Sequence, residues 1–149
     1  SNTMHKLADE LEQQLRIPLL HIADATADQV VRSGIRTVAL LGTRFTMEEE
    51  FYKSRLEEKF GLRVLVPPED QRQVVHDVIY RELCAGIINP TSRQSFTRII
   101  QSLALEGATG VILGCTEITL LVKPSDSPIP VFDTTELHVE AAVKAALRH

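Results

Sequence analysis

Two short apolar runs constrain the fold of this chain most strongly. Residues 37–41 read TVALL and residues 107–114 read GATGVILG, and neither run contains a charged side chain. A strand with one face in water alternates apolar and polar residues, whereas a strand buried on both faces is apolar throughout. Both runs therefore predict strands of a parallel sheet that helices cover on both faces.

Helical patterns alternate with these strands along the chain. Residues 24–33 read as a helix closed by Gly34, at a position where a left-handed cap favours glycine. Further helices are predicted at residues 7–15, 46–61, 69–84, 92–105 and 134–147, with a short one from 116, and further strands at 18–22, 62–66 and 131–132. This alternation predicts an α/β fold, a three-layer sandwich around a parallel sheet.

Composition narrows the possible functions. The 149 residues, 44% hydrophobic and 24% charged, suit one globular domain. The net charge of −4 argues against a nucleic-acid partner, and no apolar stretch approaches the roughly 18 residues of a membrane span. Two cysteines without a CxxC pair, together with a start that lacks a signal pattern, favour a reducing cytoplasm. The scattered histidines form no ligand pair, so no metal is expected.

The two ends of the chain are unlike its middle. Residues 35–121 contain a complete succession of strands and helices and read as a unit of their own, whereas residues 1–34 and 122–149 look like parts of something else. The chain opens SNTMHK, without an initiator Met. We expect either that Ser1 and Asn2 remain from a cleaved tag or that the chain is a piece of a longer protein.

Three junctions are unusually polar. Ligands of parallel α/β proteins bind beyond the carboxyl ends of strands, where strands lead into helices. The junctions are residues 41–46 (LGTRFT), residues 114–117 (GCTE) and, if a strand precedes them, residues 1–3 (SNT). Free N–H groups and a partial positive charge at each helix start suit a carboxylate or a phosphate.

Cys115 is the most reactive candidate at these junctions. A predicted helix N-terminus lowers the pKa of a thiol, so Cys115 reads as a nucleophile or base, and equally as a small buried apolar residue. Cys84, within a helical pattern, is interpreted as structural. Thr43 and Thr46 either bind an anion or cap the helix, with Thr46 the expected cap. Glu117 reads as a general acid or base, or as an acid that complements the helix dipole.

Three motifs together resemble the aspartate/glutamate racemase family, in its enterobacterial form. SNTMH at residues 1–5 is similar to the family's first cysteine motif, LLGTRFT at residues 40–46 to its Gly-Thr-x-x-Thr, and GCTE at residues 114–117 to its second cysteine motif. The family of cofactor-independent enzymes also includes hydantoin racemases, maleate isomerases and arylmalonate decarboxylases. Glu117, where glutamate racemases usually carry histidine, leans toward the aspartate branch.

The resemblance implies an architecture that would explain the two ends. Family members have two similar α/β domains that face each other across a cleft, and they are commonly homodimers. Residues 1–34 would then be the last part of domain one, residues 35–121 domain two, and residues 122–149 a return segment whose helix packs on domain one. About a third of the enzyme would precede Ser1, and we expect this chain alone to be inactive.

The resemblance also implies a chemistry, namely racemisation of acidic amino acids by two groups that exchange protons at the α-carbon, without pyridoxal phosphate. Cys115 matches one of these catalytic groups, and Ser1 falls where most members have the other cysteine. The positions that would bind the substrate are Asn2, Thr3, Thr43, Thr116 and Glu117.

The departure at Ser1 leaves several readings open, because a hydroxyl is a much weaker acid than a thiol. Ser1 is a natural variant, an engineered replacement of cysteine or a residue left by a tag. The alternative functions are an arylmalonate-type decarboxylase, which needs only Cys115, and a truncated product without activity.

Overall fold

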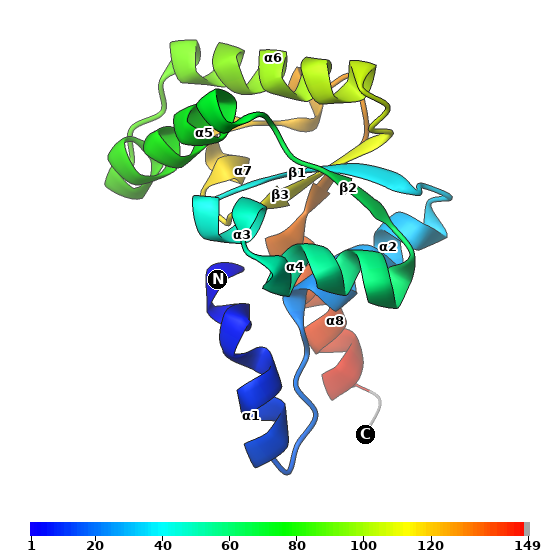
Figure 1. Cartoon of the computed structure of the whole chain (residues 1–149). Helices are drawn as coiled ribbons and strands as arrows, with labels where there is room; N and C mark the ends of the chain where they lie inside the picture. The colour runs from blue at the N-terminus through cyan, green and yellow to red at the C-terminus, as the bar shows by residue number, and fades with distance from the viewer. Residues whose placement is uncertain (148–149) are drawn as a thin grey trace.

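The computed structural model describes residues 1–147 and centres on a four-stranded sheet (Figure 1). The strands are β1 (Thr37–Gly42), β2 (Arg63–Leu65), β3 (Gly110–Gly114) and β4 (Val131–Asp133). Neighbouring strands are parallel, in the order β2-β1-β3-β4. The predicted parallel sheet is confirmed, and the two apolar runs form its central strands.

Helices cover both faces of the sheet. The α-helices are α1 (Ala8–Gln14), α2 (Ile22–Arg32), α3 (Arg44–Glu48), α4 (Glu50–Ser54), α5 (Glu69–Arg81), α6 (Pro90–Leu105), α7 (Ile118–Leu121) and α8 (Thr134–Ala146). The shorter turns are the 3-10 helices η1 (Thr3–Leu7), η3 (Leu83–Ala85) and η4 (Pro124–Asp126) and the π-helix η2 (Arg55–Lys59). Helices α5, α6 and α7 lie on one side of the sheet, and α2, α4 and α8 on the other (Figure 1). None of the described helices is long and apolar enough to cross a membrane.

The central strands supply two separate hydrophobic cores. Ala39 and Leu41 of β1 pack into the core beneath α5 and α6, whereas Val38 and Leu40 pack into the core beneath α2 and η2. All four side chains are fully buried. Because successive side chains of a strand point to opposite faces, a continuous apolar strand fills both cores. The three-layer sandwich that the apolar runs predicted is therefore present.

The strand predicted at residues 18–22 is wrong. Residues 18–21 have no regular secondary structure and do not pair in the sheet, and Ile22 already begins α2. His21 is the N-cap of that helix, and its Nδ1 accepts a hydrogen bond from the backbone N–H of Ala23 at 3.1 Å. Histidine is an uncommon N-cap residue. The sequence pattern therefore gave no sign that a helix begins here, and the apolar composition favoured a strand.

The single helix predicted at residues 46–61 is broken in two places. Glu49 has an extended backbone between α3 and α4, and the last turn widens into the π-helix η2. The break lets Met47 pack into the core on one face of the sheet, while Tyr52 and Leu56 pack into the core on the other. A straight helix over residues 46–61 would lie on one face of the sheet and could reach one core only. The cap is also corrected, because Thr43 rather than Thr46 is the N-cap of α3.

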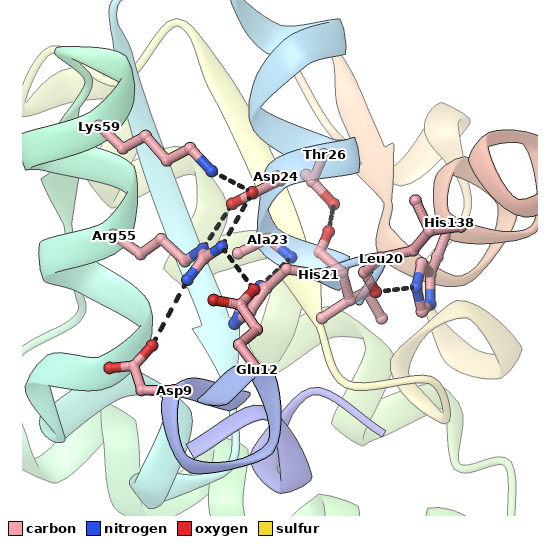
Figure 2. Close-up of polar contacts among 11 residues, drawn as sticks. Asp9, Glu12, Leu20, His21, Ala23, Asp24, Thr26, Arg55, Lys59 and His138 are labelled. Atoms are coloured by element: carbon pink, nitrogen blue, oxygen red, sulfur yellow. Dashed lines mark hydrogen bonds and ion pairs between the residues drawn. The ribbon is translucent and has the colours of Figure 1, made fainter. Parts of the chain in front are cut away.

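Charged residues hold the N-terminal helix against the sheet layers (Figure 2). Arg55 of η2 donates through Nε and Nη2 to the carboxylate of Asp24 in α2, at 2.5 and 3.0 Å. The same guanidinium lies 3.8 Å from Asp9 and 3.7 Å from Glu12 in α1. Lys59 adds a further donor to Asp24 at 2.5 Å. This network joins three segments that are far apart in sequence.

Both ends of the chain pack on the unit at residues 35–121. β4 pairs with β3 at the edge of the sheet, so part of the segment 122–149 extends that sheet, and α8 packs beside α2. The leucines of the N-terminal segment are only half covered, with Leu7, Leu11 and Leu15 between 38% and 44% exposed. The assignment of the two ends to another domain stays a prediction.

Candidate active site

A cavity of about 330 Å³ lies beyond the carboxyl ends of β1 and β3. All seven residues predicted for the site line it, together with five others. The lining residues are Ser1, Asn2, Thr3, Met4, Thr43, Ile79, Tyr80, Cys84, Gly114, Cys115, Thr116 and Glu117. The structure thus brings the three motifs together, although more than a hundred positions separate Ser1 from Cys115.

Two glycines allow the strand ends to approach closely. Gly42 of β1 pairs with Gly114 of β3 in the register of the sheet. A Cβ added at Gly42 would lie 2.9 Å from the carbonyl oxygen of Gly114, and one added at Gly114 would lie 3.1 Å from that of Leu41. The methyl group of Thr46 packs over both positions. The residues that follow the two strands, Thr43 and Cys115, therefore enter the cavity side by side.

Cys115 is buried and carries its proton. Its Sγ donates a hydrogen bond to Oε2 of Glu117 at 2.9 Å, and Oγ1 of Thr116 donates to the same oxygen at 2.7 Å. Burial, reinforced by the Glu117 carboxylate, raises the pKa of the Cys115 thiol to about 12. The same hydrogen bonds from Cys115 and Thr116 lower the pKa of Glu117. The proton therefore resides on sulfur and the carboxylate is ionised.

This result corrects the expectation that a helix N-terminus lowers the pKa of Cys115. Helix α7 begins only at Ile118 and ends at Leu121, so the helix dipole is small and lies beyond Glu117. Desolvation and a neighbouring carboxylate act in the opposite direction and dominate. The sequence showed a polar junction but not how deeply the thiol would be buried.

Hydroxyl groups connect the N-terminal residues to the end of β1. Thr3 Oγ1 lies 3.1 Å from Thr43 Oγ1, which in turn lies 3.4 Å from Thr46 Oγ1. Thr43 Oγ1 also accepts the backbone N–H of Thr46 at 3.4 Å. Thr43 and Thr46 are both buried. Both alternatives for Thr43 are thus compatible with the structure, because it caps α3 and lines the cavity.

Asn2 is held from the opposite end of the chain. Its Nδ2 donates to Oγ1 of Thr134 at 2.9 Å, and that hydroxyl donates to the carbonyl oxygen of Leu113 at 2.9 Å. Asn2 is 3% exposed, and its Oδ1 is buried without a hydrogen-bond partner among the described residues. Sequence reasoning missed Thr134. It follows directly after β4, so the strand-end rule that selected Thr43 and Cys115 also applies to it.

Ser1 and Cys84 complete the rim. Ser1 is exposed, and its carbonyl oxygen accepts a hydrogen bond from Nδ1 of His5 at 2.9 Å. His5 is half-buried, and its ring lies 4.6 Å from that of His21. Cys84 lies in η3, is exposed and borders the same cavity as Cys115. Within residues 1–147, no group of three or more His, Cys, Asp or Glu side chains could hold a metal ion.

The molecule is a parallel α/β protein with a thiol, a carboxylate and several hydroxyls gathered at the ends of its central strands. The family model for Asp/Glu/hydantoin racemases matches residues 1–142. The chain belongs to that family, as its three motifs indicated.

Solved structures and a curated relative agree with this assignment. A putative Asp/Glu racemase from Yersinia pestis is 53% identical with a TM-score of 0.95, over 99% of this chain and 64% of its own. An aspartate racemase homologue from Pyrococcus horikoshii OT3 is 36% identical with a TM-score of 0.88, over 98% and 64%. The broad specificity amino-acid racemase RacX of Bacillus subtilis (strain 168) is 26% identical over 99% of this chain and 63% of that protein. The chain thus spans less than two thirds of each relative.

Proposed function

We propose that the protein containing this chain racemises aspartate or glutamate by proton transfer at the α-carbon, without pyridoxal phosphate. One observation carries the proposal: Cys115, hydrogen-bonded to Glu117, faces the same cavity as Ser1. Membership of the racemase family and the similarity to RacX support the reaction class. A cavity of about 330 Å³ also suits a small ligand.

Cys115 and Glu117 would work as a pair on one face of the substrate. The α-proton of an amino acid is very weakly acidic, so the group that removes it must be a strong base placed close to it. As a thiol, Cys115 donates a proton to the α-carbon. As a base, it first transfers its proton to Glu117, whose Oε2 is 2.9 Å from Sγ, and the thiolate then removes the α-proton.

The other face requires a second group, and Ser1 is the candidate because it lines the cavity from a different segment. Its hydroxyl is a weaker acid than a thiol, so we expect unequal rates in the two directions. The α-carboxylate would accept hydrogen bonds from the hydroxyls of Thr3, Thr43 and Thr116. The ammonium group would donate to the side-chain amide oxygen of Asn2.

Isotope exchange tests this function. The full-length protein is incubated in D2O with L-aspartate and, separately, L-glutamate, and loss of the α-proton signal and of optical rotation is followed. We expect Cys115→Ala to lower exchange by about 10²- to 10⁴-fold, the usual contribution of an acid–base group. Cys84→Ala removes the other thiol of the cavity and is the matched control. Exchange that survives in Cys115→Ala would refute the assigned role.

The chain by itself provides a second comparison. We expect little turnover from residues 1–149 alone, because each relative extends well beyond the region that matches this chain. Turnover equal to that of the full-length protein would contradict this expectation.

A decarboxylase is the second candidate, and the protonated state of Cys115 favours it. Loss of carbon dioxide from a malonate leaves an electron pair at the α-carbon, which a single thiol proton donor can quench. A serine at position 1 is compatible with that reaction. An arylmalonate that releases carbon dioxide with this protein, while aspartate and glutamate keep their α-protons, would favour the decarboxylase.

A further inference from the structure

Thr134 connects the cavity to the carboxyl end of the chain. It is the first residue of α8, directly after β4, and it is fully buried. Its hydroxyl lies between two partners, Asn2 of the cavity and the backbone of Leu113 in β3. This hydroxyl therefore comes from a helix that contains none of the predicted site residues.

The directions of these two hydrogen bonds follow from chemistry. The carbonyl oxygen of Leu113 can only accept, so the single proton of the Thr134 hydroxyl is committed to it. The oxygen of that hydroxyl can then only accept from Asn2, which must present its NH₂ group. Thr134 therefore determines which way the Asn2 amide is turned.

Because the NH₂ group of Asn2 faces Thr134, its oxygen Oδ1 is fixed on the other side of the amide as an acceptor. Asn2 Oδ1 is buried and has no partner among the described residues, although Asn2 lines the cavity with Cys115. A buried acceptor without a partner is unfavourable, by about 1–3 kcal/mol. A hydrogen-bond donor on a bound ligand would remove that penalty.

We propose that Thr134 is a positioning residue, which orients Asn2 so that Oδ1 accepts a hydrogen bond from the ammonium group of the substrate. This inference rests on the proposed function. At neutral pH the ammonium group is the only strong donor of an acidic amino acid, and a carbonyl oxygen in the cavity would repel both carboxylates. Thr134 would thus help the site to distinguish amino acids from dicarboxylic acids of the same length.

Binding measurements on the full-length protein test the idea directly. Thr134→Val keeps the shape of the side chain but removes the hydroxyl, whereas Thr134→Ser keeps the hydroxyl. Calorimetry compares L-aspartate with succinate, and L-glutamate with glutarate, since each second ligand lacks only the ammonium group. A hydrogen bond to a charged group is worth at least about tenfold in affinity.

We expect Thr134→Val to bind the amino acid about tenfold more weakly while its affinity for the dicarboxylic acid stays within about twofold. Thr134→Ser should restore the preference for the amino acid. Equal losses for both ligands, or a serine variant that behaves like valine, would show that Thr134 only packs. Failure of the unsubstituted protein to bind either amino acid would instead refute the proposed function.

A spectroscopic readout needs neither turnover nor a folded valine variant. The side-chain amide protons of Asn2, identified in ¹⁵N spectra by their loss in Asn2→Ala, should exchange slowly with water in the unsubstituted protein and in Thr134→Ser. Exchange as fast as that of an exposed asparagine in the unsubstituted protein would overturn the proposal.

Discussion

Cys115 and Ser1 line the same cavity, but the segments that carry them are attached to the molecule in different ways. The strand-end wall, formed by Thr43, Cys115, Thr116 and Glu117, follows β1 and β3, which are buried except at Thr37. Their terminal glycines, Gly42 and Gly114, pair with no room for a Cβ. The N-terminal wall, formed by Ser1, Asn2 and Thr3, is joined to the rest by hydrogen bonds, and the helix after it is held by ion pairs.

One wall is held rigidly by the packing of the sheet, and the other is placed by polar contacts. Packing in a sheet core leaves little freedom to the residues at its edge. Ion pairs and single hydrogen bonds contribute less and depend on salt and pH. We therefore expect the two walls to respond to different substitutions.

The largest effect is expected at the glycine contact of the strand-end wall. Gly42→Ala would place a Cβ 2.9 Å from the backbone carbonyl oxygen of Gly114 and 3.0 Å from the Cβ of Thr46. We expect the free energy of unfolding to fall by about 3 kcal/mol, the upper end of overpacking costs. Urea denaturation measures this loss.

Gly34→Ala is the matched control for this substitution. It meets no atom within 4 Å, but its φ of 77° is unfavourable for alanine, which costs about 1–2 kcal/mol. Equal losses in the two variants would show that strand contact does not hold this wall.

The next effect concerns the N-terminal wall. Arg55→Met removes the guanidinium that joins α1 to Asp24, and Asp24 is 24% exposed. We expect a loss of about 2 kcal/mol, below the range for fully buried pairs. Hydrogen exchange should become faster in residues 3–14 and stay unchanged in β3. Lys144→Met, which removes an exposed ion pair with Glu140, is the control. It should change neither the free energy of unfolding nor the hydrogen exchange of residues 3–14. Unchanged hydrogen exchange in α1 would show that Arg55 does not hold the N-terminal wall in place.

A smaller effect tests the charge within the strand-end wall. In a Cys84→Ala background, Glu117→Gln removes the carboxylate that helps to raise the pKa of Cys115. We expect Cys115 to react about tenfold faster with iodoacetamide at pH 8, since each pKa unit changes the thiolate fraction about tenfold. An unchanged rate would show that burial alone controls the thiol.

The Cys115–Glu117 pair also makes the free energy of unfolding depend on pH in the alkaline range. Because folding raises the pKa of Cys115 from 9.0 to about 12, its contribution is fully present below pH 9 and is lost as the pH rises through about 12. Glu117→Gln should reduce this decline. Unfolding measured at pH 8 and pH 10.5 in both proteins checks the direction.

The smallest effect lies where the two walls meet. Thr43→Val removes the N-cap of α3 and the hydroxyl that contacts Thr3. Loss of a cap is worth about 1 kcal/mol. Thr97→Val, which removes a hydroxyl bonded within its own helix, is the control and should cost less. If the free energy of unfolding falls no more in Thr43→Val than in the control, the Thr43 cap does not stabilise the fold.

Particular elements show how far the sequence predicts this fold. The helix at residues 24–33, the strands at residues 37–41 and 107–114, and Gly34 with its φ of 77° follow from local patterns, and all are present, although β3 begins only at Gly110. The strand expected at residues 18–22 and the unbroken helix expected at residues 46–61 are wrong. In the first case Leu20 stays 41% exposed and His21 caps a helix, so no strand forms. In the second case Met47 and Tyr52 reach different cores, and that depends on residues distant in sequence.

Most of the succession of elements, the family and the seven residues that the structure gathers around one cavity follow from the sequence alone. Periodicity and short motifs encode these features because they depend on neighbours along the chain. Three further features depend on the folded arrangement: Cys115 holds its proton, Arg55 joins three segments and Thr134 orients Asn2. Burial and hydrogen bonding across 132 positions have no local signature, so they emerge only when the chain folds.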